Sequence, residues 1–134
     1  MDTLVDTSVW IDFFNGNSTP QTACLEELLS CGDACTSPII IMEVLQGIRN
    51  DKQCKKTEQM LLCLTRYPIA EEYYRESAML YRSLRKRGVT IRKSLDCLIA
   101  VTAIQNTLPI LHCDRDFRAI AEHSDLITCS FNAH

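Results

Sequence analysis

Four acidic residues, spread along the chain, stand where they could share one divalent metal ion. Asp6 and Asp114 each end a short apolar segment that is typical of a strand. Glu43 lies in the second turn and Asp96 in the first turn of apolar segments that are typical of helices. Close carboxylates repel by about 4 kcal/mol per pair at 4 Å and an effective dielectric constant of 20. A hard cation such as Mg²⁺ or Mn²⁺ would offset that repulsion and could activate water for phosphodiester hydrolysis.

Each acid also has an ordinary structural interpretation. Asp6 could cap a helix that starts at Thr7, unless the neighbouring hydroxyls do so and leave the carboxylate free. Glu43 could pair with an arginine, although a lone buried carboxylate is costly. Asp96 is favoured by the dipole of its own helix. Asp116 could cap the helix that begins at Phe117 or serve as a further metal ligand.

Acids from distant parts of the chain meet only if strands and helices alternate in a parallel sheet. The carboxyl ends of such strands share one edge, where open α/β sheets bind their ligands. The Ser37-Pro38 pair predicts a capped and largely buried helix running to about Arg49, and Ser94 predicts a second cap. The expected strands are Thr3–Asp6, Ala34–Thr36, Tyr67–Ile69 at an edge, Pro109–His112 and Leu126–Cys129.

Composition agrees with one globular domain over residues 1–134, with 46% hydrophobic and 23% charged residues. No apolar run approaches a membrane span and the N-terminus does not resemble a signal peptide, so we expect a cytoplasmic protein. The eight cysteines fit neither a disulfide framework nor zinc-ligand spacing, and most are expected to fill the core. A net charge of −3 disfavours a generally basic nucleic-acid binder, although an acidic metal cluster would itself supply negative charge.

The densest basic run leads directly into Asp96. It is either a solvated helix end and loop or a surface that contacts RNA phosphates. His112 is a candidate base or substrate contact, although such a residue is more often a core histidine. The basic run comprises Arg82, Arg85, Lys86, Arg87, Arg92 and Lys93, and the RNA-binding candidates are Arg85, Arg87, Arg92 and Lys93.

Four stretches together resemble the PIN-domain family and, within it, the VapC-type toxins of bacterial toxin–antitoxin pairs. They occur in the family's order and spacing and span nearly the whole chain. His112 stands where many relatives have threonine, which leaves its role open. The stretches are Val5-Asp6-Thr7-Ser8-Val9-Trp10-Ile11, Glu43 through Gly47, Ser94-Leu95-Asp96-Cys97-Leu98-Ile99-Ala100 and Leu111-His112-Cys113-Asp114-Arg115-Asp116-Phe117.

The resemblance implies a three-layer α/β/α sandwich with a central, mostly parallel sheet. It implies a Mg²⁺- or Mn²⁺-dependent endoribonuclease, a homodimer, and inhibition by a small VapB-type antitoxin that binds near the active site. Ser8 matches a hydroxyl that supports the first aspartate. The implied catalytic and metal-binding residues are Asp6, Glu43, Asp96 and Asp114, with Asp116 as an auxiliary ligand.

Two early helices carry more bulky apolar side chains than one small sheet requires. If these helices lie side by side, they leave a hydrophobic groove beside Asp6 and Glu43 that an amphipathic antitoxin helix would fit. The alternative is that these residues form the core. The candidates are Trp10, Phe13, Phe14, Leu45 and Ile48.

Two other functions remain open from the sequence. A phosphatase of the haloacid dehalogenase type also begins with an aspartate at a strand end, but it needs a second acid two residues on, where this chain has Ser8. A PIN fold that binds RNA or a partner without cutting is disfavoured by the full acid set. Metal-dependent RNA cleavage that Asp6→Asn abolishes would exclude both.

Overall fold

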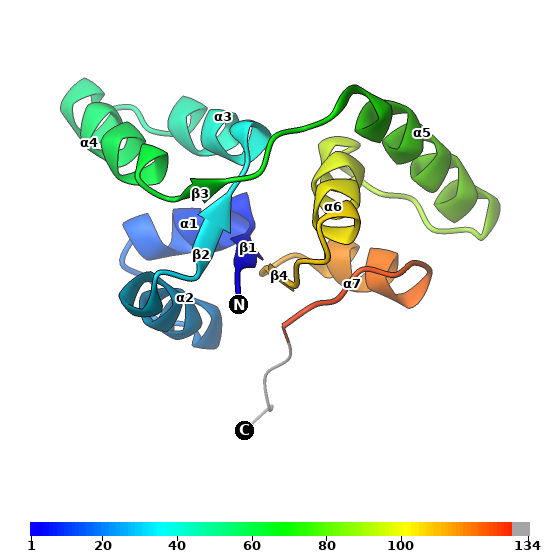
Figure 1. Cartoon of the computed structure of the whole chain (residues 1–134), viewed down its shortest axis with the longest axis horizontal. Coiled ribbons are helices and arrows are strands. Elements are labelled where there is room, and N and C mark those ends of the chain that lie inside the picture. Colours follow the sequence, from blue (N-terminus) through cyan, green and yellow to red (C-terminus); the bar gives the residue numbers. More distant parts are fainter. Residues whose placement is uncertain (130–134) are drawn as a thin grey trace.

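A four-stranded parallel sheet forms the centre of the protein in the computed structural model, which describes residues 1–129 (Figure 1). The strand order is β3-β2-β1-β4, and all three neighbouring pairs are parallel. Every connection between neighbours therefore crosses over through at least one helix, as a parallel sheet requires. The strands are β1 (Thr3–Val5), β2 (Ala34–Thr36), β3 (Thr65–Arg66) and β4 (Ile110–Leu111).

The helices form two groups, and the second group (α5, α6 and α7) lies to the right of the sheet in Figure 1. In the first, α1 packs against α2 and α3, and α3 packs against α4. In the second, α6 packs against α5 and α7. This arrangement confirms the predicted α/β fold with a central parallel sheet. The helices are α1 (Thr7–Phe14), α2 (Pro20–Cys31), α3 (Pro38–Gln46), α4 (Asp51–Leu62), α5 (Glu71–Lys86), α6 (Leu95–Gln105) and α7 (Arg115–Glu122).

The central strand β1 holds the middle of the core. Leu4 and Val5 are completely buried, and their neighbours in register are Cys35 of β2 and Leu111 of β4. At the end of the strand, the backbone N–H of Asp6 donates to the Leu111 carbonyl at 2.9 Å. The first acid therefore leaves the sheet at a point fixed by β4.

Helix α6 is the buried helix of the fold. Every residue from Asp96 to Ala103 is buried, so a carboxylate enters the core at the first turn. The prediction of a largely buried helix after Pro38 was wrong in degree. Helix α3 ends at Gln46 and buries only Ile39, Ile40 and Val44, because its other face is turned to solvent.

The strand predicted at Tyr67–Ile69 lies two residues earlier, at Thr65–Arg66, although its edge position is right. Tyr67 still donates its N–H to the Thr36 carbonyl, but Pro68 has no N–H to continue the ladder. The strand predicted at Leu126–Cys129 is reduced to a single bridge between Ile110 and Thr128.

Neither serine predicted to cap a helix makes a capping hydrogen bond through its side chain. The Ser37 hydroxyl donates instead to the Tyr67 carbonyl at 2.8 Å and so ties α3 to the end of β3. All eight cysteines are free, but only Cys35 and Cys97 are fully buried, so most of these thiols are not core residues. No helix within residues 1–129 is long and apolar enough to cross a membrane.

Candidate active site

Asp6 caps the helix that it precedes. One carboxylate oxygen, Oδ2, accepts from the Ser8 backbone N–H at 3.1 Å and from the Ser8 hydroxyl at 2.6 Å. The Ser8 hydroxyl oxygen also accepts from the Cys113 N–H at 3.0 Å, which links the ends of β1 and β4. Burial raises the pKa of Asp6, and the bonds from Ser8 oppose that rise. The capping interpretation is therefore right, and it still leaves Oδ1 available to a ligand.

Glu43, on α3, contacts α1 through the hydroxyl of Thr7. The Thr7 hydroxyl donates to Glu43 Oε1 at 2.9 Å, so the two helices that begin at this sheet edge hold the carboxylate between them. Glu43 is half-buried, and no arginine within residues 1–129 forms an ion pair with it. The alternative of a salt bridge to arginine was wrong.

Asp96 is the most perturbed acid of the site. It is 3% exposed, and its Oδ2 has no hydrogen-bond partner within the described part of the chain. Burial, followed by repulsion from Asp6 and Asp114, raises the pKa of Asp96 to about 7, although Lys93 opposes the shift. An unpaired buried carboxylate is costly, which marks this oxygen as a place for a cation.

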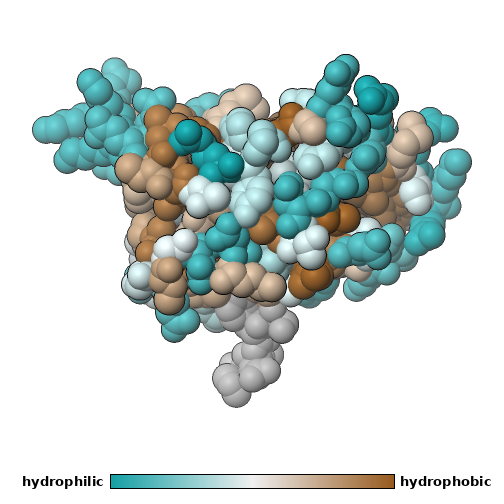
Figure 2. Space-filling model, viewed as in Figure 1, coloured by the Kyte–Doolittle hydropathy of each residue, from teal (hydrophilic) through white to brown (hydrophobic). Residues whose placement is uncertain are grey.

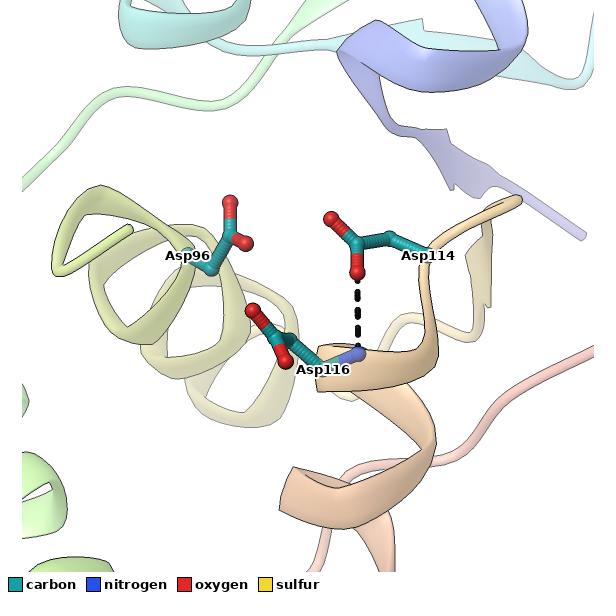
Figure 3. A group of neighbouring side chains, drawn as sticks. All are labelled: Asp96, Asp114 and Asp116. Carbon is teal, nitrogen blue, oxygen red and sulfur yellow. Dashed lines mark hydrogen bonds between the residues drawn. The ribbon is translucent and has the colours of Figure 1, made fainter. Parts of the chain in front are cut away.

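Asp114 lies between β4 and α7, and Asp116 lies in the first turn of α7. Asp114 Oδ1 accepts from the Asp116 N–H at 2.9 Å, so Asp114 is the cap of α7 and Asp116 is not (Figure 3). Arg92 pairs with both acids: its Nη2 lies 3.1 Å from Asp114 Oδ1 and its Nε 3.3 Å from Asp116 Oδ2. The Arg92 backbone N–H also donates to Asp116 Oδ2 at 3.2 Å.

Three of these acids come close enough to share one ion. One carboxylate oxygen each from Asp96, Asp114 and Asp116 lie within 4.8 Å of one another, and the three side chains point toward a common centre in Figure 3. Oxygen donors of this kind suit Mg²⁺ or Mn²⁺. Together with the unpartnered Asp96 Oδ2, this donor set fits a hard divalent cation.

All four predicted acids line a single cavity of about 320 Å³, which we call the acid cavity. The sequence therefore identified the residues that meet. Asp116, the predicted auxiliary ligand, does not line this cavity but lies close to Asp96 and Asp114. The members of the acid cavity used below are Asp6, Thr7, Ser8, Ile11, Asp12, Glu43, Lys93, Asp96, Cys113 and Asp114.

Two of these polar residues, Thr7 and Asp12, were missed. Asp12 is four residues after Ser8, so the two share one face of α1. That spacing would have revealed Asp12. Thr7 was considered only as a helix start, and its bond to Glu43 depends on how α1 and α3 pack, which the sequence does not show.

The basic run divides in the structure. Lys93 lines the acid cavity, and Arg92 is held by Asp114 and Asp116 and is therefore not a free phosphate contact. Arg85 lies over the Tyr81 ring at 5.9 Å. Arg87 Nη1 lies 3.3 Å from His123 Nδ1, at the end of α7. Neither Arg85 nor Arg87 lines the acid cavity.

Helices α1 and α3 do lie side by side, and a small cavity of about 130 Å³ opens between them. Phe14 and Ile48 line it and Ile11 joins it to the acid cavity, whereas Phe13 and Leu45 are half-buried and do not line it. Trp10 is different: it is completely buried and stacks on Phe14 with ring centroids 6.0 Å apart. Trp10 was therefore wrongly assigned to a partner surface and belongs to the core.

His112 is half-buried at the end of β4. Its Nδ1 accepts from the Asp114 N–H at 3.2 Å, and its ring lies 5.4 Å from the Phe117 ring. Burial lowers the pKa of His112. A neutral ring with Nδ1 occupied as an acceptor carries its proton on Nε2. His112 therefore helps to position Asp114.

Comparison with known proteins agrees with this geometry. Residues 3–123 match the family model of the PIN domain. Ribonuclease VapC11 of Mycobacterium tuberculosis is 33% identical over 132 residues, which cover 96% of this chain and 98% of the relative. Ribonuclease VapC1 of Methanocaldococcus jannaschii is 36% identical over 107 residues, covering 80% of this chain and 71% of that protein.

Solved structures share the fold at lower identity. VapBC2 from Rickettsia felis, solved with a DNA fragment from its promoter, matches with a TM-score of 0.78 and 20% identity, covering 98% of this chain and 100% of that chain. FitAcB from Neisseria gonorrhoeae matches with a TM-score of 0.75 and 23% identity, covering 96% of each chain. With a family match across most of its length and full-length VapC relatives, this chain belongs to the PIN-domain family and, within it, to the VapC group.

Proposed function

We propose that the protein is a metal-dependent endoribonuclease and the toxin of a type II toxin–antitoxin pair. The observation that carries this proposal is the convergence of Asp6, Glu43, Asp96 and Asp114 on one cavity, with Asp96 Oδ2 buried and unpartnered. The relatives named as VapC ribonucleases support the choice of RNA as the substrate.

Asp96, Asp114 and Asp116 would hold the ion, and Asp6 and Glu43 form the acidic wall of the acid cavity together with Asp96 and Asp114. When bound, Mg²⁺ or Mn²⁺ would lower the pKa of a bound water and stabilise the charge that develops on the phosphoryl oxygens. The acidic wall also explains why the cation is needed, since it would otherwise repel the substrate phosphate.

The chain's own residues prepare this site. Ser8 fixes the orientation of Asp6 through two hydrogen bonds, and Thr7 does the same for Glu43 through one. Lys93 is exposed at the acid cavity and is our candidate for binding the scissile phosphate. Arg92 spans Asp114 and Asp116 and so orients both acids.

We place the antitoxin on the small cavity between α1 and α3. Phe14 and Ile48 would take its apolar side chains, with Phe13 and Leu45 at the margin. Ile11 joins this cavity to the acid cavity, so a basic side chain of the same partner would reach the acids. A homodimer and a cytoplasmic location complete the proposal.

The decisive experiment measures RNA cleavage with Mg²⁺ or Mn²⁺ and with a chelator. We expect cleavage only with metal, and a loss of at least about a hundredfold in Asp6→Asn and Asp96→Asn. Asp51→Asn, which neutralises an exposed acid on α4, is the matched control and should cleave normally. Equal cleavage by Asp96→Asn and the control would contradict the proposal.

A growth experiment tests the toxin role. Induction of the wild type in a bacterial host should arrest growth, and co-expression of the small protein encoded beside its gene should restore it. Growth arrest that persists in folded Asp96→Asn would assign toxicity to something other than cleavage.

A further inference from the structure

A second cavity, with a volume of about 370 Å³, adjoins the acid cavity. Asp12, Cys113 and Asp114 line both, so the two form one continuous surface. The volume lies near the lower end of the range of about 300–1,000 Å³ that holds small ligands, which is room for one nucleotide and not for a folded element. We call it the arginine cavity, and its remaining lining is Thr19, Gln21, His112, Arg115 and Arg118.

Two guanidinium groups enter the arginine cavity from α7. Arg115 and Arg118 are three residues apart and therefore lie on one side of that helix. Both residues are exposed, and neither is paired with an acid within residues 1–129. Arg92, by contrast, is committed to Asp114 and Asp116. The arginine cavity thus offers positive charge directly beside an acidic cavity.

The cavity also offers neutral hydrogen-bonding groups. His112 receives the Asp114 N–H at Nδ1, so its other ring nitrogen is the one left to contact a ligand. Gln21, from α2, supplies an amide that both donates and accepts. Cations with a few such groups suit a nucleotide better than they suit an inorganic ion alone.

We propose that the arginine cavity binds the nucleotide next to the cleaved bond of a single-stranded RNA, with Arg115 and Arg118 on its phosphate and Gln21 and His112 on its base or sugar. The inference rests on the proposed function, because it assumes that the scissile phosphate occupies the acid cavity. A neighbouring phosphate must lie outside the acidic wall formed by Asp6, Glu43 and Asp96. The arginine cavity adjoins that wall, and there Arg115 and Arg118 offset the charge of Asp12 and Asp114.

The first test is binding without cleavage. A fluorescently labelled, mixed-sequence single-stranded RNA is titrated with protein in chelator at several salt concentrations. We expect Arg115→Ala/Arg118→Ala to bind about tenfold more weakly and its log–log salt slope to fall by about 1.4, the value for two phosphate contacts on a single strand. Lys55→Ala/Lys56→Ala, which removes equal charge from the exposed face of α4, is the control.

Figure 2 shows hydrophilic residues gathered over the region of α4, away from α7 in the same view, so the control changes net charge without touching either cavity. Binding by the arginine variant that matches the control overturns the proposal. If the alanine variant does not fold, Arg115→Gln/Arg118→Gln takes its place and is judged by the same comparison.

The second test uses cleavage and locates the contact. Once the cleaved bond of an RNA is mapped with wild type, neutral methylphosphonates replace the flanking phosphates one at a time. We expect one flanking position to raise KM about tenfold in wild type and to have no effect in Arg115→Ala/Arg118→Ala. Equal sensitivity of both proteins at every position overturns the subsite.

Failure of the proposed function and failure of the nucleotide subsite give different results. A wild type that binds RNA through Arg115 and Arg118 but never cleaves it would overturn the proposed function and leave the arginine cavity as an RNA-binding site without a cleaved bond beside it. A wild type that cleaves, with the arginine variant unchanged in KM and salt slope, would support the function and overturn the subsite.

Discussion

Asp96 makes the pH dependence of the fold predictable. Burial raises its pKa from 3.8 to about 7, so between these values the folded protein keeps a proton that the unfolded chain has released. Its contribution to stability therefore decreases as pH rises from about 4 to about 7. In chelator, Asp96→Asn should be about 4 kcal/mol more stable than wild type at pH 8 and equally stable well below pH 4. Urea unfolding at several pH values measures this difference, and a constant difference would contradict it.

Arg92 is the cation that partly neutralises the site when no metal is bound. Its guanidinium contacts Asp114 and Asp116, and these contacts raise the pKa of Arg92. We expect Arg92→Gln to lower Tm in chelator and to gain more than wild type from Mn²⁺, since the ion then supplies the missing positive charge. Thermal denaturation with and without Mn²⁺ gives both values, with Arg75→Gln on α5 as the control. An equal metal-induced gain in both variants would assign Arg92 no part in the charge balance of the site.

For single residues, the sequence predicted which acids lie close together but not which hydrogen bonds and ion pairs hold them. Strand ends and helix starts indicated the sheet edge to which Asp6, Asp96 and Asp114 belong. The partner of Glu43 was missed because it depends on the approach of α1 to α3, and no local pattern encodes that distance. The role of Arg92 was misjudged for the same reason, because Asp114 and Asp116 are more than twenty residues away along the chain.

Helix α1 carries one aromatic residue that belongs to the core and another that lines a cavity, and their substitution should have different effects. Trp10 is completely buried, so Trp10→Ala should cost about 3–5 kcal/mol and give little folded protein. Phe14 is only half-buried and lines the cavity beside α3, so Phe14→Ala should remain folded and lose binding to the antitoxin. Urea unfolding and co-purification check the two expectations. Normal antitoxin binding by folded Phe14→Ala and Ile48→Ala would remove the partner from this cavity.

Element boundaries were predicted where local chemistry decides them. Gly32 ends α2 in the left-handed conformation, at a φ of 74°, as is common for a glycine at a helix end. The errors arose where tertiary contacts determine the boundary. The Ser37 hydroxyl bonds to Tyr67 instead of capping α3, and β3 ends before Pro68, which has no N–H to donate. The apolar run at Ile39–Ile41 predicted burial, but only Ile39, Ile40 and Val44 of α3 are buried.

Charge on the molecule as a whole is unevenly distributed, in spite of a net charge of only −3. Within the basic run, Arg87 lies beside the end of α7, next to His123. We therefore propose that Arg85 and Arg87 extend the RNA path beyond the arginine cavity. Arg85→Ala/Arg87→Ala should lower the salt slope of RNA binding by about 1.4 without changing cleavage at saturating RNA. An unchanged slope would leave both residues as solvated surface.

The hydrogen bond from the Asp6 N–H to the Leu111 carbonyl has a consequence for hydrogen exchange. Strand β1 is paired on both sides, so its amides exchange with deuterium only when the sheet opens, whereas the Asp116 amide is held by one side chain at a helix end. We expect the Asp6 amide to be among the slowest to exchange with or without metal, and the Asp116 amide to slow markedly when Mn²⁺ binds. Asp6 would then lie in a part of the fold that is rigid with or without metal. The start of α7, which carries Asp116, would become rigid only when the ion binds.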